Sequence, residues 1–173
     1  MTFNLSGYSK KTVQYLIKMM GYLVVFIVIY TLINLWRSPT MPDDVDLTYQ
    51  NSHGQLTNIA TASHDKPILV YFWGTWCHVC RTTSPNVQAL HADGYEVLTV
   101  AVSSGNDDEL LSHMNERGYD FATINDTDGA IFGAWQGQVT PSFVIVSDGK
   151  MVQSFTGVAP LWLLKLRLLM AKI

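Results

Sequence analysis

The chain has 173 residues and a formal net charge of -3, and 48% of its residues are hydrophobic, enough for one ordinary domain with a buried core and an appended segment. No run of Lys or Arg occurs beyond a few N-terminal residues, which argues against nucleic-acid binding. The two cysteines belong to one Cys-x-x-Cys sequence and are too close together to cross-link distant segments, which excludes a disulfide-framework fold.

The first predicted element is an uncharged apolar segment from Met19 to Trp36. As a helix it would be about 27 Å long, roughly the thickness of the hydrocarbon core of a bilayer. Positive residues precede it and an acidic cluster follows it, namely Lys10, Lys11 and Lys18 before it and Asp43, Asp44 and Asp46 after it. Because positive residues favour the cytoplasmic side, we expect residues 1–18 in the cytoplasm, a single-pass anchor over 19–36, and the rest of the chain across the membrane.

Two other interpretations of this segment are weaker. A cleaved signal peptide is disfavoured because the apolar stretch is long and no small-residue cleavage site follows it. A buried core helix is disfavoured because the segment is apolar on every face. Pro39 and Pro42 then predict an extended linker over residues 37–44, so the globular domain is expected over residues 45–173, beginning near Val45.

The globular part alternates predicted strands and helices. Continuous β-branched and aromatic runs predict buried strands at Ile68–Trp73 and Val97–Val102. We also expect a helix over residues 107–118, N-capped by Asn106. A hairpin with an Asp-Gly turn is expected over residues 142–155, and an amphipathic C-terminal helix over residues 159–172. This order predicts an α/β fold with parallel strands at its centre.

The Cys-x-x-Cys pair, Cys77 and Cys80, lies where the strand Ile68–Trp73 gives way to a predicted helix. At a helix N-terminus, unpaired N–H groups and the positive end of the macrodipole favour a thiolate over a thiol, so Cys77 is the predicted nucleophile. Helical i, i+3 spacing brings Cys80 beside it. From there Cys80 can attack a mixed disulfide formed at Cys77 and release the partner protein, so Cys80 is the predicted resolving cysteine.

A set of motifs in chain order carries a family resemblance. The motifs are a Trp-x-x-Trp-Cys-x-x-Cys pattern, a helix-kinking proline and a Thr-Pro loop, formed by Trp73, Trp76, Cys77, Cys80, Pro85, Thr140 and Pro141. From about Leu47 to its end, the chain thereby resembles the thioredoxin superfamily and its membrane-anchored TlpA-like branch. The resemblance implies a thioredoxin-like fold, a central mixed sheet flanked by helices, with an extra helix and strand inserted over about residues 107–124.

The resemblance also implies roles for residues near the cysteines. It implies that Pro141 is a cis-proline that packs against the cysteines, and that Thr140 touches an extended substrate peptide. Trp76 is expected to be partly exposed as an apolar rim for partner proteins, whereas Trp73 is expected to pack in the core. His78, when protonated, is expected to stabilise the neighbouring thiolate.

The activity implied by the resemblance is that of a protein-disulfide oxidoreductase in the periplasm, anchored in the bacterial inner membrane. Its partners would be thiols and disulfides of extracytoplasmic proteins and a membrane redox protein of the DsbD or DsbB type. Its redox centre would be the Cys77–Cys80 disulfide, with no dissociable cofactor. Within the branch, the tether and the Cys-His-Val-Cys sequence are most similar to the D family of the suppressor-of-copper-sensitivity systems (ScsD), which implies a link to copper tolerance.

The direction of the reaction is open among oxidation, reduction and isomerisation. Relatives carry acidic residues at three positions where this chain has Tyr71, Thr83 and Ser142. A reductant needs its resolving thiol deprotonated, so these replacements weaken the alternative of a cytochrome c maturation reductase.

The alternative from another class is a copper(I)-binding accessory protein, because soft thiolates select copper(I). A zinc site is disfavoured because zinc takes four ligands and the sequence contains no second cysteine pair or paired histidines, so no metal ligand is predicted. The remaining histidines are expected on solvated loops or helix surfaces, namely His53, His64, His91 and His113.

Overall fold

The computed structural model describes residues 10–42, 48–50, 54 and 56–172 of the chain. The chain divides into two units, residues 1–36 and 37–173. All but the last residue of the helix α1 (Lys10–Arg37) belongs to the first unit. The stretch Lys11–Asn34 of this helix is long and apolar enough to cross a membrane, with a mean hydropathy of 2.3.

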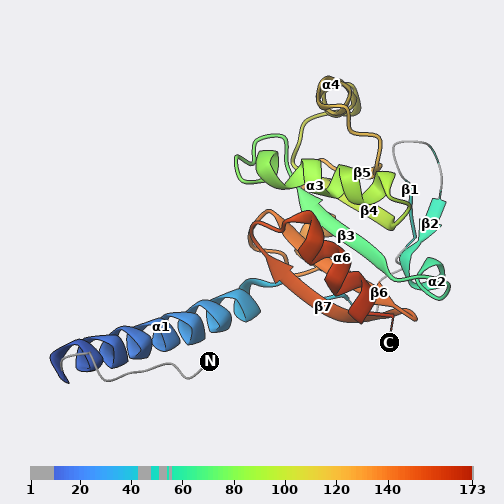
Figure 1. Ribbon diagram of the computed structural model, residues 1–173. Helices are drawn as coiled ribbons and strands as arrows, with labels where there is room; N and C mark the ends of the chain where they lie inside the picture. Colours follow the sequence, from blue (N-terminus) through green and yellow to red (C-terminus); the bar gives the residue numbers. More distant parts are fainter. Residues whose placement is uncertain (1–9, 43–47, 51–53, 55, 173) are drawn as a thin grey trace. The chain divides into compact units, whose positions relative to one another are not determined.

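The second unit is built on a five-stranded sheet with the order β5-β4-β3-β6-β7 (Figure 1). The central strand β3 (Ile68–Trp73) pairs in parallel with β4 (Glu96–Val102) and antiparallel with β6 (Ser142–Ser147). On the outer sides, β5 (Ala122–Asp126) pairs in parallel with β4, and β7 (Lys150–Thr156) pairs antiparallel with β6. The sheet is therefore mixed, and the expected thioredoxin-like α/β fold is confirmed.

Helices cover both faces of this sheet. The helices of the second unit are α2 (Ile59–Ala62), α3 (Cys80–Ala92), α4 (Asp107–Arg117), α5 (Ala130–Ala134) and α6 (Leu161–Met170). A short antiparallel pair of strands, β1 (Thr48–Gln50) and β2 (Leu56–Asn58), precedes them. Alternate residues of β3, namely Leu69, Tyr71 and Trp73, pack in one core cluster with α3, α4 and α6. The intervening residues of β3, beginning with Ile68, pack with α2 and α5 on the other face. This alternation follows from the period of two along a strand.

The helix α4 and the strand β5 form the insertion that the family resemblance implies, with the strand continuing to Asp126. The helix begins with a capping box, as Asn106 predicts: its side chain accepts the N–H of Glu109 at 3.0 Å, and the Glu109 carboxylate accepts the N–H of Asn106 at 2.9 Å. Gly118 ends the helix with φ of 66°, a left-handed conformation that costs glycine little.

The i, i+3 spacing of Phe132 and Trp135 predicts a short apolar helix that packs in the core, and α5 is that helix. A buried carboxylate holds its first turn. Asp126, only 2% exposed, accepts the N–H of Ile131 at 3.0 Å and that of Phe132 at 2.9 Å. Such bonds satisfy N–H groups that have no partner within a helix. The helix ends at Trp135, which is fully buried, as expected of a core residue.

The first part of the expected linker packs on the domain. Ser38 and Pro39 are buried, and the N–H of Thr40 donates to the carbonyl oxygen of Trp135 at 2.8 Å. Residues 43–47, which include the acidic cluster and the expected domain start at Val45, lie outside the described residues. The chain therefore already contacts the domain a few residues after α1.

Candidate active site

Cys77 and Cys80 form a disulfide with an S–S distance of 2.12 Å and a Cα–Cα distance of 5.3 Å. Cys80 is the first residue of α3, and Cys77 lies in the turn between β3 and α3. The Cys80 N–H donates a hydrogen bond to the Sγ of Cys77 at 3.1 Å. Once the disulfide is reduced, that N–H favours negative charge on Cys77, in line with the predicted order of the two cysteines.

Hydrogen bonds hold the turn that carries Cys77, both within the turn and to the segment around the end of β4. The N–H of Cys77 donates to the carbonyl oxygen of Gly74 at 3.1 Å, and the N–H of Thr75 donates to the Ser104 hydroxyl at 3.1 Å. The indole N–H of Trp76 donates to the carbonyl oxygen of Val102 at 2.9 Å. The end of β4 and the residues just after it thereby fix the loop that precedes the disulfide.

Trp76 presents an aromatic surface beside the disulfide. Its side chain is 58% exposed, although its indole N–H is bonded. The ring lies so close to Gly74 that a Cβ there would be 2.7 Å from two ring atoms. His78 and Val79, on the other side of Cys77, are also exposed. The structure thus places Trp76 and His78 beside the cysteines, where the sequence predicts them.

Trp73 has a structural role, as expected. It is 1% exposed, and its indole N–H donates to the hydroxyl of Thr99 at 3.1 Å. That hydroxyl is 2.9 Å from the hydroxyl of Thr123, which in turn donates to the carbonyl oxygen of Phe121. A chain of hydrogen bonds therefore runs from β3 through β4 to β5 inside the core.

The Thr140–Pro141 peptide bond is cis, as the resemblance implies. Pro141 immediately precedes β6, and the first residue of β6, Ser142, is paired with Phe72 of β3. This register places Pro141 beside the end of β3, from which the turn to the cysteines departs. Thr140 is half-buried, and its hydroxyl has no hydrogen-bond partner among the residues that the structure describes.

Hydroxyl groups occupy the interior near Cys80. The phenol of Tyr71 lies 2.9 Å from the hydroxyl of Ser84, and both residues are buried. Burial raises the pKa of Tyr71 above its usual range, and the hydrogen bond with Ser84 offsets this only in part. Tyr71 is therefore a neutral phenol at physiological pH.

His113 differs from the expectation that it is solvated. Its side chain is half-buried, its ring centroid is 5.9 Å from that of Trp73, and it lines a small pocket together with Cys80. The reason is that Leu110 and Met114 of the same helix are buried in the core, which turns the adjacent His113 toward α3. The helical period predicts this inward face, but the sequence alone does not show that α4 docks beside the cysteines.

Two of the other histidines lie near carboxylates. His64 is largely exposed and lies 3.7 Å from Asp148, and His91 lies 3.8 Å from Asp120. His53 is outside the described residues. Within the described part of the chain, no group of three or more His, Cys, Asp or Glu side chains is arranged to hold a metal ion.

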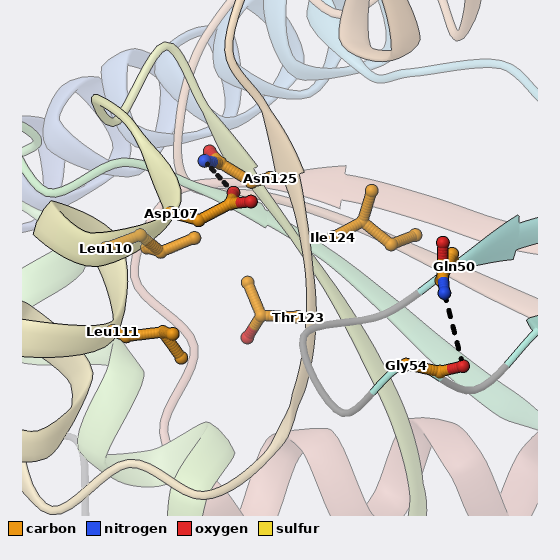
Figure 2. Close-up of a pocket in the computed structure, with 8 residues that line it drawn as sticks. All are labelled: Gln50, Gly54, Asp107, Leu110, Leu111, Thr123, Ile124 and Asn125. Atoms are coloured by element: carbon orange, nitrogen blue, oxygen red, sulfur yellow. Dashed lines mark hydrogen bonds between the residues drawn. The ribbon is translucent and has the colours of Figure 1, made fainter.

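A second pocket, of about 410 Å³, is formed by the insertion and the β1–β2 pair (Figure 2). In Figure 2, side chains from α4 and β5 line one part of it and Gln50 and Gly54 another; the Asn125 amide donates to the Asp107 carboxylate at 2.8 Å. None of its lining residues belongs to the turn that carries the cysteines. This pocket is therefore separate from the candidate active site.

Comparisons with known proteins identify relatives of this chain. The sequence matches the Redoxin family over residues 38–161. It is 39% identical over 148 residues to a thioredoxin-like protein of Haemophilus influenzae, covering 85% of this chain and 89% of that protein. It is 33% identical over 97 residues to the thiol-disulfide oxidoreductase ResA of Bacillus subtilis, covering 53% of this chain and 54% of ResA.

Among solved structures, a secreted thiol-disulfide isomerase from Corynebacterium glutamicum matches with a TM-score of 0.64 and 17% identity. The match covers 79% of this chain and 93% of the isomerase. At this level of identity, the similarity concerns the fold.

Proposed function

The chain belongs to the redoxin family, and we propose that it is a thiol-disulfide oxidoreductase in which Cys77 and Cys80 exchange disulfides with other proteins. The observation that carries the proposal is the disulfide at the junction of β3 and α3, with the Cys80 N–H directed at the Cys77 sulfur. The relative ResA is named for the same activity.

The reaction follows from the unequal positions of the two sulfurs. In the reducing direction, the Cys77 thiolate attacks a partner disulfide and forms a mixed disulfide, releasing one partner thiolate. The Cys80 thiolate then attacks the Sγ of Cys77, which forms the internal disulfide and releases the second partner thiolate. The pair loses two electrons and the partner gains two, so the proposed reaction needs no dissociable cofactor. The oxidising direction is the reverse.

Partner proteins would bind at the surface around Cys77. Trp76 supplies an exposed aromatic ring, and Thr140 and Pro141 supply the loop beside the end of β3. An extended peptide could pair with that loop by backbone hydrogen bonds. His78, exposed next to Cys77, would stabilise the thiolate when it is protonated.

We further propose that α1 anchors the enzyme in the bacterial inner membrane, with the N-terminus in the cytoplasm and the redoxin domain in the periplasm. The length and hydropathy of Lys11–Asn34 support a spanning helix, and the preceding lysines support the orientation. The partners would be extracytoplasmic thiols and disulfides and a membrane redox protein of the DsbD or DsbB type. A shared membrane would raise the effective concentration of such a protein. Protease treatment of spheroplasts should degrade the domain of the full chain, whereas protection of the domain would contradict this orientation.

The finer assignment is to the ScsD family, with a role in copper tolerance. The tether and the Cys-His-Val-Cys sequence support it. Cytochrome c maturation is the weaker alternative, because Thr83 and Ser142 replace the acids of such reductants. Deletion of the gene should make the bacterium more sensitive to copper and leave its c-type cytochromes at normal levels. The opposite pair of results would favour the alternative.

The experiment that tests the activity is a redox titration of the full chain in detergent, in glutathione buffers, followed by tryptophan fluorescence. A potential near roughly -270 mV would indicate an electron donor, and one near roughly -120 mV a disulfide donor. The Cys80→Ser variant serves as control, because it cannot form the internal disulfide. Absence of a two-electron transition in the wild type, together with stoichiometric copper(I) binding, would instead support a copper-binding accessory protein.

A further inference from the structure

The resolving step requires a proton acceptor for the Cys80 thiol, because only a thiolate attacks the mixed disulfide efficiently. None of the three positions where relatives carry acids provides one. The hydroxyl of Ser142 donates to the carbonyl oxygen of Val139. Tyr71 is a buried phenol bonded to Ser84. The hydroxyl of Thr83 donates to the carbonyl oxygen of Val79 at 3.3 Å. A proton acceptor must therefore come from another element.

A small pocket joins Cys80 to the insertion helix α4. Its volume is about 10 Å³, close to the minimum that one water molecule requires. The residues that line it include Ser84 from α3, His113 from α4 and Tyr119 just after α4, whose side chains can all hydrogen-bond to a water molecule. Three such side chains match the number of hydrogen bonds that an ordered water molecule usually makes.

The packing of α4 fixes His113 at this pocket. Leu110 and Met114 anchor the helix in the same core cluster that contains Cys80. The His113 ring lies against Trp73, the last residue of the strand that leads to the cysteines. The imidazole therefore faces the site from a capped, core-anchored helix.

The charges around His113 suit a proton acceptor. Burial lowers the pKa of His113 below its usual value, and the positive charges of Arg117 and Arg81 lower it further, while Glu116 opposes them. The uncharged residues that line the pocket with His113 are Trp73, Gly74, Thr75, Cys80, Ser84 and Tyr119. At neutral pH the imidazole is therefore mostly unprotonated and able to accept a proton.

We propose that His113 accepts the proton of the Cys80 thiol, through one water molecule in this pocket, when Cys80 resolves the mixed disulfide. The thiolate forms the S–S bond to Cys77 as the bond to the partner breaks, and the partner thiolate recovers a proton from the imidazolium or from solvent. This inference rests on the proposed function and names the residue that replaces the missing acids. In the opposite direction, His113 returns the proton to Cys80.

The test uses the reduced full chain in detergent and an aromatic disulfide whose thiol product is coloured. The first release of colour reports the attack by Cys77, and the second reports the attack by Cys80. At about pH 7, His113→Gln should slow the second release by about tenfold or more and leave the first within about twofold. The deficit should shrink above about pH 9, where a thiol ionises without help. His64→Gln, which changes an exposed histidine outside this pocket, should alter neither release.

Chemical rescue separates proton transfer from packing. In His113→Ala, added imidazole should restore the second release and leave the first unchanged. A second release at the wild-type rate and pH profile in both variants would overturn the proposal. Equal slowing of both releases without rescue would overturn it too, since that pattern indicates a structural role. Failure of the wild type itself to release any colour would contradict the proposed function instead.

Discussion

The backbone N–H of Cys80 is directed at the sulfur of Cys77 at 3.1 Å, so the two halves of the disulfide have different surroundings. Cys77 has a hydrogen-bond donor, and Cys80 is the more completely buried residue, with 1% of its surface exposed against 5%. After reduction, negative charge is therefore favoured at the outer sulfur.

This asymmetry predicts different outcomes for the two serine substitutions. Cys77→Ser should abolish insulin reduction, because the attacking thiolate is lost. Cys80→Ser should accumulate mixed disulfides with substrates, because nothing resolves them, and these are detected by mass spectrometry after thiol alkylation. Equal activity in the two variants would show that the assigned roles are wrong.

Alanine substitution of the two tryptophans near the site should have different effects, one mainly on stability and the other mainly on activity. Trp73→Ala should lower the free energy of unfolding by about 3–5 kcal/mol, because the side chain is buried. Trp76→Ala should cost about 1 kcal/mol, chiefly the hydrogen bond to Val102, yet lower kcat/KM for a protein disulfide by about tenfold or more. Urea unfolding and insulin-reduction kinetics measure the two effects. A large stability loss at Trp76 would mean that it is a core residue.

Gly74 is expected to tolerate no side chain. In Gly74→Ala the new Cβ would lie 2.7 Å from the Trp76 ring, which must then move. The variant should therefore show altered tryptophan fluorescence and reduced activity toward protein substrates. Gly133→Ala is the matched control, because no atom lies within 4 Å of a Cβ there and alanine favours the helix α5. Unchanged fluorescence in Gly74→Ala would contradict the packing of the ring.

Asp126 should be a strong local contributor to stability. Asp126→Ala removes a buried carboxylate that accepts two N–H groups, so the free energy of unfolding should fall by about 2–4 kcal/mol. Asp128→Ala removes an exposed acceptor of one N–H in the same loop and should cost about 1 kcal/mol or less. Equal losses in urea unfolding would mean that burial of Asp126 adds nothing.

The depressed pKa of His113 links stability to pH. The unfolded chain takes up a proton near about pH 6.5, whereas the folded chain takes it up only at a lower pH. The folded state should therefore lose stability as pH falls from about 6.5 through the folded pKa, and not above that range. The His113→Gln variant should lose less free energy of unfolding over the same pH range, as measured by urea unfolding. An equal loss in the variant would assign the acid sensitivity to other groups.

Local patterns were sufficient to predict the main elements of the fold. The apolar run Ile68–Trp73 is the central strand, and the Asn106 cap begins α4 where the sequence places it. The cysteines and the cis-proline follow from motif and resemblance. These features depend on neighbours in the sequence or on a familiar order of motifs.

Features that depend on tertiary packing were not predictable. Asp126 ends a strand and also caps α5, and no local pattern distinguishes it from a solvated turn residue. His113 reads as a surface residue until α4 is placed against α3. The pairing of Thr99 with Thr123 requires the register of β4 and β5, which lie on different sides of a helix in the sequence.

The hydrogen bonds that run from Trp73 through Thr99 to Thr123 have a consequence for protein engineering. They couple the insertion to the strand before the disulfide through Thr99 of β4. A chimera that takes residues 107–126 from a relative would keep the core polar groups satisfied only if the donor supplies a hydroxyl at position 123. Exchange of the insertion between family members is therefore constrained from inside the sheet as well as at the protein surface.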